Sequence, residues 1–242
     1  ILKIQRNTYA MLDDLKKNMS GEIVLGLTHE HGIDIFTSIF PQFNRRYPGI
    51  SFTLIERIVA EQHQLLLDGN LDFGIVMLQE SEKINLRYIN LYREQLILGI
   101  PQNHPMASFA APPDAPLACL DLGLFKNDKF SLIFSASTMR RVLDPCFDEA
   151  GFRPSIVIET AMNHALVQMV ASGFCCTIMP ESRARISPYY SRCAWFTLTS
   201  HPHWDVSIAC RKDTQLSEAH KYFIRLAQKY GQKMESQLLQ NR

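Results

Sequence analysis

The sequence lacks a marked excess of charge of either sign. Its 242 residues include 25 Lys and Arg against 24 Asp and Glu, so the formal net charge is +1 at pH 7. Nucleic-acid-binding proteins usually carry a clear basic excess, because Lys and Arg neutralise the phosphates of the backbone. The composition therefore argues against nucleic-acid binding by this chain itself.

Long apolar runs are lacking as well. None approaches the roughly twenty residues that a membrane-spanning helix needs, and residues 1–19 alternate charged and apolar side chains, unlike a signal peptide. Hydrophobic residues make up 46% and charged residues 20% of the chain, which is typical of a globular protein and not of a disordered one. We expect a cytoplasmic protein with no membrane partner.

The cysteines lack the C-x-x-C spacing of zinc knuckles and thioredoxin-like motifs. Most lie in apolar segments, which favours buried, inert thiols in a reducing compartment. The adjacent pair Cys175–Cys176 leaves redox sensing open as an alternative, although that chemistry needs an exposed, electropositive setting. The six are Cys119, Cys146, Cys175, Cys176, Cys193 and Cys210.

Enzyme motifs are lacking in the same way: there is no G-x-S-x-G elbow, P-loop or G-x-G-x-x-G run. The densest group of metal-ligand types is His29-Glu30-His31, but histidines two positions apart diverge, whereas those of H-E-x-x-H share a helix face. We interpret it as a loop, with a metal site as the alternative. We interpret the run His201-Pro202-His203-Trp204 as a turn. No catalytic residue, metal ligand or cofactor is predicted.

What the sequence does contain is an alternation of strand and helix patterns. Pro41 and Pro145 fall within helical patterns, as kinks or as points where a helix restarts. The first elements read as β-α-β-α-β, which implies parallel pairing with right-handed crossovers. Strands are predicted near residues 23–27, 52–57, 73–77, 87–99, 130–134, 155–159, 175–179, 194–198 and 205–210. Helices are predicted over 36–47, 62–67, 163–172 and 219–230, and a further helix from 138 onward.

Prolines cluster between residues 101 and 116, which indicates a passage from one lobe into another. Two similar α/β lobes joined by extended crossings near residues 100 and 200 form the simplest topology. A separate helix with 3-4-3-4 apolar spacing precedes them and ends at Ser20-Gly21. The predicted division is a helix over 1–20, a first lobe over 21–100 and 200–242, and a second lobe over 101–199.

Small polar residues follow several predicted strands. In open α/β sheets, ligands bind beyond the carboxyl ends of parallel strands, where helix N-termini favour anions. Each residue alone also fits a helix cap, but their recurrence in both lobes predicts a site for a small anion between them. Arg140 either neutralises that anion or lies on a solvated helix face. The residues are Thr28, Ser135, Ser137, Thr138, Thr160, Asn163 and the run Pro180-Glu181-Ser182.

Several stretches resemble the effector-binding domain of LysR-type transcriptional regulators. Their order and spacing cover essentially the whole chain. The resemblance implies a periplasmic-binding-protein-like α/β fold, with two Rossmann-like subdomains joined by two crossover strands, preceded by a linker helix over 1–20, and no enzymatic activity. The stretches are residues 40–49 (FPQFNRRYPG), 67–75 (LDGNLDFGI), 104–107 (HPMA) and 170–180 (VASGFCCTIMP).

The resemblance also implies a function and partners. The domain would bind a small effector, and chains would form homodimers or homotetramers. A winged helix-turn-helix domain, which is outside this sequence, would precede the linker helix and bind promoter DNA. His29 is bulkier than the small polar residue expected there, and could pair with a carboxylate and titrate near neutral pH. The family's effector contacts map onto Thr28, His29, Ser135, Ser137 and Thr160.

Two other functions remain open from the residues. A transport-class solute-binding protein would use the same fold to capture a solute, and would need an export signal. A hydrolase would use the loop His29-Glu30-His31 and a metal ion.

Overall fold

The computed structural model describes residues 20–112 and 115–240. The predicted helix over 1–20 therefore lies outside the described residues up to position 19, and Ser20 and Gly21 begin a strand. The described chain forms two compact units. Unit 1 comprises residues 20–76, 84–91 and 207–232, and unit 2 comprises residues 77–83, 92–206 and 233–240.

Unit 1 is built on a sheet with the strand order β2-β1-β3-β10-β4. Strand β1 pairs in parallel with both β2 and β3, which confirms the predicted β-α-β-α-β order. Strands β3, β4 and β10 continue into unit 2, as does helix α7. The elements are β1 (Ser20–Leu27), α2 (His31–Arg46), β2 (Gly49–Glu56), α3 (Val59–Leu67), β3 (Phe73–Leu78), β4 (Arg87–Pro101), β10 (His203–Cys210) and α7 (Glu218–Gln240).

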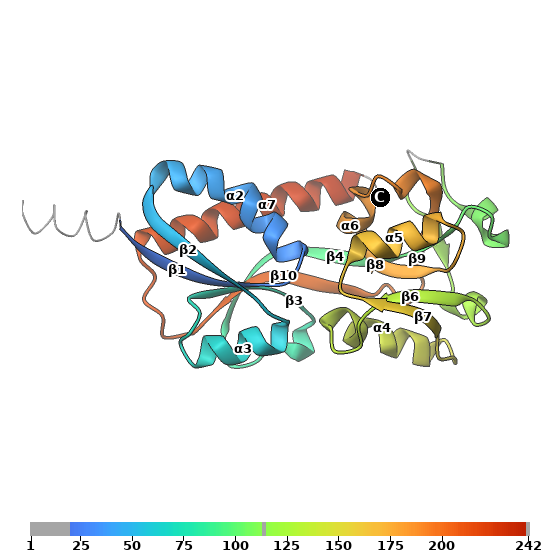
Figure 1. Cartoon of the computed structure of the whole chain (residues 1–242), viewed down its shortest axis with the longest axis horizontal. Coiled ribbons are helices and arrows are strands. Elements are labelled where there is room, and N and C mark those ends of the chain that lie inside the picture. Colours follow the sequence, from blue (N-terminus) through green and yellow to red (C-terminus); the bar gives the residue numbers. More distant parts are fainter. Residues whose placement is uncertain (1–19, 113–114, 241–242) are drawn as a thin grey trace, which may run out of the picture. The chain divides into compact units, whose positions relative to one another are not determined.

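Helices cover both faces of this sheet, with α2 and α7 on one side and α3 on the other (Figure 1). On the first side, aromatic rings from α2, β2, β3 and α7 form the core, because Phe223 lies within 6.0 Å of Phe43, Phe52 and Phe73 between ring centroids. Pro41 lies inside α2, which is one continuous helix.

Unit 2 contains a parallel pair of strands, β6 (Lys129–Ile133) and β7 (Ser155–Thr160). Helix α5 (Asn163–Ala171) lies on one side of this pair and α4 (Thr138–Glu149) on the other (Figure 1). Strand β4 pairs antiparallel with β8 (Thr177–Pro180) and with β9 (Cys193–Leu198), and β9 pairs with β5 (Cys119–Leu120).

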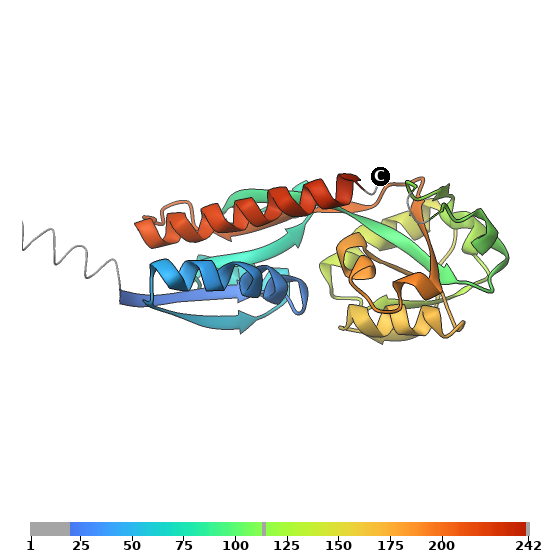
Figure 2. The same cartoon turned by 90° about the horizontal axis from the view of Figure 1, so that it is seen from above.

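Short helical segments complete unit 2. They are the α-helix α6 (Glu181–Arg185) and the 3-10 helices η1 (Glu80–Glu82), η2 (Pro105–Phe109), η3 (Leu122–Phe125) and η4 (Tyr190–Arg192). Figure 2 shows the same fold seen from above. Helix α4 runs through Pro145 without a restart.

Two local predictions need correction. The strand predicted from residue 175 begins at Thr177, although Cys176 forms a parallel bridge with Phe130 just before it. The turn predicted over His201-Pro202-His203-Trp204 is shorter than expected, because β10 begins at His203. Trp204 is 4% exposed, so burial of its ring favours the strand.

Candidate functional site

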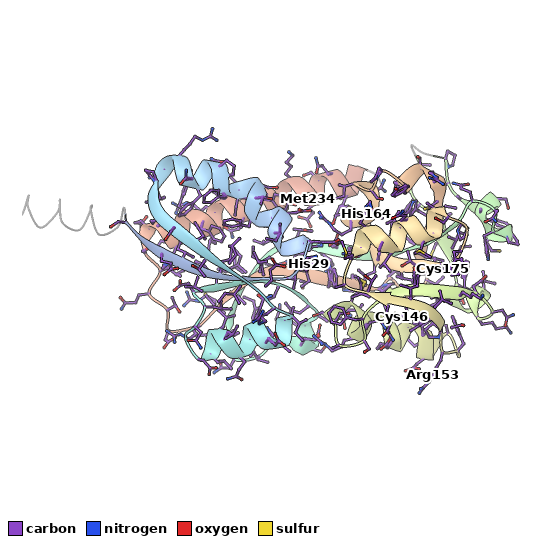
Figure 3. All side chains as sticks on the ribbon, viewed as in Figure 1. His29, Cys146, Arg153, His164, Cys175 and Met234 are labelled. Atoms are coloured by element: carbon purple, nitrogen blue, oxygen red, sulfur yellow. The ribbon has the colours of Figure 1, made fainter. Side chains whose placement is uncertain are left out.

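The loop after β1 carries the two predicted effector residues of unit 1, Thr28 and His29. The His29 ring Nδ1 lies 2.9 Å from Glu56 Oε2 at the end of β2, with both side chains about half exposed. His29 is thus paired with a carboxylate of the chain itself. Glu30 has a φ of +58°, which non-glycine residues adopt infrequently, and His31 beyond it is buried. Figure 3 shows His29 at this end of the strand.

The turn between β6 and α4 carries three predicted residues of unit 2. Ser137 is the N-cap of α4, and its Oγ accepts a hydrogen bond from the Arg140 N–H at 3.2 Å. Thr138 Oγ1 accepts from Arg141 Nη2 at 3.1 Å. Both residues are buried, whereas Ser135 is exposed. The cap interpretation is therefore correct for Ser137, and Ser135 is the most accessible hydroxyl of this turn.

The turn between β7 and α5 carries the other two, Thr160 and Asn163. Thr160 Oγ1 accepts from the Met162 N–H at 3.2 Å, and Asn163 is the buried first residue of α5. The Phe134 N–H donates to the Thr160 carbonyl at 3.1 Å, so the two turns lie side by side at the carboxyl ends of a parallel pair. Unit 2 thus brings its five predicted residues to one edge of the sheet, at the N-termini of two helices.

Arg140 takes neither of its two expected roles. Its side chain is buried, with Nε 2.8 Å from Asp144 Oδ1 and Nη1 2.6 Å from Glu159 Oε1. Burial opposes its charge, but the hydrogen bonds to Asp144 and Glu159 outweigh that effect and raise the pKa of Arg140. It connects α4 to β7, beside a pocket of about 360 Å³ that also contacts Arg153 and Asp148.

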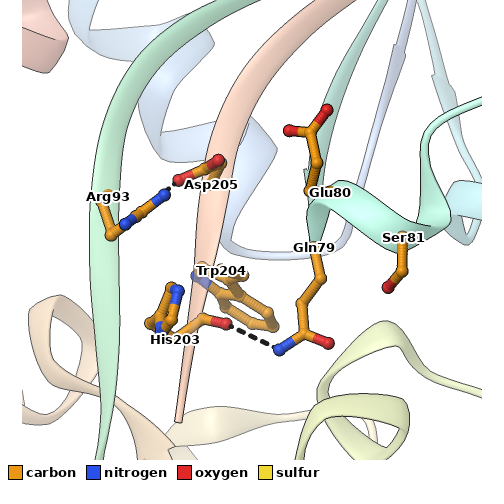
Figure 4. A pocket seen from close by; sticks show the side chains of 7 residues that line it. All are labelled: Gln79, Glu80, Ser81, Arg93, His203, Trp204 and Asp205. Atoms are coloured by element: carbon orange, nitrogen blue, oxygen red, sulfur yellow. Dashed lines mark hydrogen bonds and ion pairs between the residues drawn. The ribbon is translucent and has the colours of Figure 1, made fainter. Parts of the chain in front are cut away.

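A pocket of about 330 Å³ lies at the end of β3, entirely within unit 2. Arg93 and Asp205 form an ion pair in its wall at 2.9 Å, and Gln79 donates from Nε2 to the His203 carbonyl at 3.4 Å (Figure 4). No sequence motif points to this pocket, because the pattern around His203 and Trp204 predicts a turn and Arg93 lies in a strand pattern without a chemical motif. Its lining residues are Gln79, Glu80, Ser81, Arg93, His203, Trp204 and Asp205.

Glu94 on β4, which contacts the pocket residue Trp204, is fully buried. Its Oε2 accepts from the indole N–H of Trp204 at 3.1 Å, and its Oε1 accepts from the Ser182 N–H at 3.0 Å. The carboxylate therefore joins β4, β10 and the first residues of α6. In the run Pro180-Glu181-Ser182, predicted as a ligand position, Ser182 uses its N–H in this internal contact.

The cysteines are free thiols, and all except Cys119 are buried. Burial raises the pKa of Cys146, Cys175, Cys176 and Cys210, and raises that of Cys193 to about 12. Cys146 lies on α4 and Cys175 just before β8 (Figure 3). The adjacent pair Cys175–Cys176 therefore lacks the exposed setting that redox sensing requires.

Two other kinds of site are absent from the residues that the structure describes. Within 20–112 and 115–240, no three His, Cys, Asp or Glu side chains are grouped so that they could hold a metal ion. In the same part of the chain, no helix is both long and apolar enough to cross a membrane.

The two compact α/β units, with polar residues at the carboxyl ends of their parallel strands, are typical of two-lobed ligand-binding domains. The sequence pattern of the LysR substrate binding domain matches residues 16–232, and the chain belongs to this family. It is therefore a small-molecule-binding domain of the LysR-type transcriptional regulators, and this family is favoured over that of the transport-class binding proteins.

Several similar proteins are named as HTH-type transcriptional regulators. The chain is 26% identical over 221 residues to the HTH-type transcriptional regulator YwbI of Bacillus subtilis (strain 168), covering 90% of this chain and 70% of the relative. It is 24% identical to the HTH-type transcriptional regulator BudR of Raoultella terrigena, covering 87% and 67%. Against another regulator of Bacillus subtilis, YybE, the match covers only 54% of the relative's length.

Solved structures show the same fold. The effector binding domain of QuiR in complex with shikimate superposes with a TM-score of 0.69 at 20% identity, covering 88% of this chain and 98% of that domain. The regulatory domain of CcmR from Synechocystis PCC6803, in complex with 2-PG, has a TM-score of 0.73 at 18% identity, covering 89% and 99%. These likenesses confirm the predicted periplasmic-binding-protein-like architecture.

Proposed function

We propose that this domain senses a small anionic metabolite on behalf of a LysR-type regulator that binds promoter DNA through a separate helix-turn-helix domain. The regulator would act in the cytoplasm as a homodimer or homotetramer, without enzymatic activity. Membership of the family supports the sensing role, and the relatives named as HTH-type regulators support the DNA-binding partner domain.

The preference for an anion rests on the hydrogen-bonding state of the hydroxyls in unit 2. Ser137, Thr138 and Thr160 each accept a hydrogen bond from an N–H group of the chain. A hydroxyl whose oxygen accepts one of these bonds still has its O–H to donate, so it suits a ligand group that accepts. The N-termini of α4 and α5 add positive dipole ends at the same edge. Carboxylates, sulfate and phosphates meet these requirements.

We further propose that Thr28 and His29 of unit 1 contact the same ligand as Ser135, Ser137, Thr138, Thr160 and Asn163 of unit 2. His29 already has Glu56 beside it, so an anion would compete with that carboxylate for the ring. Exchange of partners at a pair that is half exposed costs little, since such ion pairs contribute about 0–1 kcal/mol.

A thermal-shift screen of small carboxylates, sulfate and phosphate tests this function. A ligand present at 100 times its dissociation constant should stabilise the chain by about 2.7 kcal/mol. Thr28→Val and Ser135→Ala should each remove most of the shift. Ser172→Ala is the matched control, because Ser172 is an exposed serine at the opposite end of α5. If the two site variants keep the full shift given by a confirmed ligand, the assignment of these residues is wrong.

A further inference from the structure

We propose that the pocket between β3, β10 and β4 is a second ligand site, and that it takes a small zwitterion carrying both a carboxylate and a protonated amine, such as a free amino acid. The pocket shares no residue with the predicted effector contacts, so the proposal goes beyond the function proposed above.

The pocket wall contains both a cationic side chain, Arg93, and anionic ones, Glu80 and Asp205, and this favours a ligand with charges of both signs. Arg93 extends from β4, and Glu80 is the first residue of η1, which follows β3, with β10 between β3 and β4 in the sheet order. Asp205 on β10 lies beside Arg93 (Figure 4). A simple anion would meet the carboxylates of Glu80 and Asp205, and a simple cation would meet Arg93. A zwitterion places each of its charges against the opposite one.

The charged groups have unused bonding capacity. Arg93 uses Nε to donate to Asp205 Oδ1 at 2.9 Å, and its side chain is 61% exposed. The planar guanidinium presents its two NH₂ groups as a fork suited to a ligand carboxylate. Glu80 contacts Lys83 Nζ through Oε2 at 2.6 Å with 83% of its side chain exposed, and Oε1 can accept from an ammonium group. Asp205 thus orients Arg93 without saturating it.

The wall is rigidly supported from within unit 2. Gln79 and Glu82 form a reciprocal capping box around η1, with the Gln79 N–H 2.9 Å from Glu82 Oε2. The other oxygen of Glu82 accepts from Arg141 Nε at 2.5 Å. On β4, the buried Glu94 accepts a hydrogen bond from the Trp204 indole N–H and holds that ring in place. The site is therefore preformed, and a volume of about 330 Å³ is at the small end of ligand pockets.

Isothermal titration calorimetry of this chain with the twenty amino acids is the primary test. At least one should bind, and the same carbon skeleton lacking either the amine or the carboxylate should bind at least tenfold more weakly. Arg93→Gln and Glu80→Gln should each weaken binding at least tenfold. Arg57→Gln and Glu61→Gln are the matched controls, because these exposed residues pair with each other on unit 1, and both should bind normally.

Trp204 reports where the ligand binds. The chain has two tryptophans, so in a Trp195→Phe background the fluorescence of Trp204 should change saturably at the calorimetric midpoint. If Arg93→Gln fails to fold by circular dichroism, Arg93→Lys replaces it, since it keeps the charge but loses the fork.

Three results would overturn the proposal: no amino acid binds, the matched carboxylate binds as tightly as the amino acid, or Arg93→Gln and Glu80→Gln bind normally. Binding that is lost in Thr28→Val and Ser135→Ala but kept in Arg93→Gln belongs to the proposed effector residues. That outcome rejects this pocket and leaves the proposed function standing.

Discussion

Five of the six cysteines have buried side chains, and burial is the largest cause of the raised pKa at each of them. The thiolate is the reactive form, so a higher pKa means a smaller reactive fraction at any given pH. We expect a single fast-reacting thiol, Cys119, when the native chain is treated with a disulfide reagent at pH 8, and six after denaturation.

Substituting Cys119→Ser should abolish the fast phase, whereas replacing both Cys175 and Cys176 by Ser should leave it unchanged. A fast phase that disappears with the Cys175/Cys176 double variant would restore the redox alternative.

Arg140 illustrates what could not be predicted from sequence at the residue scale. The sequence placed it correctly near the start of a helix, where an anion or solvent would meet it. Its actual partners are Asp144, one turn along the same helix, and Glu159 on a neighbouring strand. The first is a local i, i+4 contact that spacing suggests. The second depends on the register of β7 against β6, which no local pattern specifies.

At the scale of elements, the N-terminus of α7 is closed by a reciprocal pair of hydrogen bonds. The His220 N–H donates to Ser217 Oγ, and the Ser217 N–H donates to His220 Nδ1, each at 3.3 Å. The second bond requires that Nδ1 carry no proton. Burial lowers the pKa of His220, against an opposing influence from Asp72. Geometry and pKa therefore both favour the neutral ring.

We expect this cap to make the chain less stable in mild acid. Because the pKa of His220 is lower in the folded chain, the unfolded chain takes up the proton first, so the stabilisation is complete above the ordinary histidine pKa of about 6.5 and is lost below it. The urea midpoint should fall between pH 7.5 and pH 5.0. His220→Gln keeps a side-chain acceptor for the cap and should show a smaller fall.

His164→Gln serves as the comparison, because His164 is exposed on α5, and its midpoint should fall as much as that of the unaltered chain. An equal fall in the His220→Gln variant would show that another group causes the acid sensitivity.

Most elements could be predicted from periodicity and turn residues, and the failures have local causes. Strand β10 begins two residues before the predicted start because Trp204 is anchored by the buried Glu94, 110 positions away. Helix α4 contains Pro145 without a break, so the packing of its buried face outweighs a penalty of about 3 kcal/mol. In both cases tertiary contacts override a local preference.

At the scale of the whole molecule, the sequence predicted the α/β class, and the resemblance added the two-subdomain family architecture. The candidate effector residues could be predicted as a group because they follow parallel strands, a position with a physical meaning. The pocket of Arg93 and Asp205 could not be found in this way. Its residues come from three segments far apart in the chain, and only the strand order β3-β10-β4 brings them together.

The two units share β3, β4, β10 and α7, and this continuity predicts that they unfold together. Gly231 on α7 faces β4 within unit 1, where an added Cβ would come within about 2.4 Å of the Leu91 carbonyl oxygen. Gly231→Ala should therefore destabilise unit 1 by about 1–2 kcal/mol, after about 1 kcal/mol of improved helix propensity is deducted.

Both tryptophans, Trp195 and Trp204, lie in unit 2, so their fluorescence follows that unit while far-ultraviolet circular dichroism follows the entire chain. If strands running through both units couple their unfolding, Gly231→Ala lowers the urea midpoint of both signals equally, and the exposed control Gln228→Ala changes neither. A lower midpoint by circular dichroism with an unchanged fluorescence midpoint would mean that unit 1 unfolds alone. In that case the parts of the shared strands that lie in unit 1 would unfold while the parts in unit 2 stay folded.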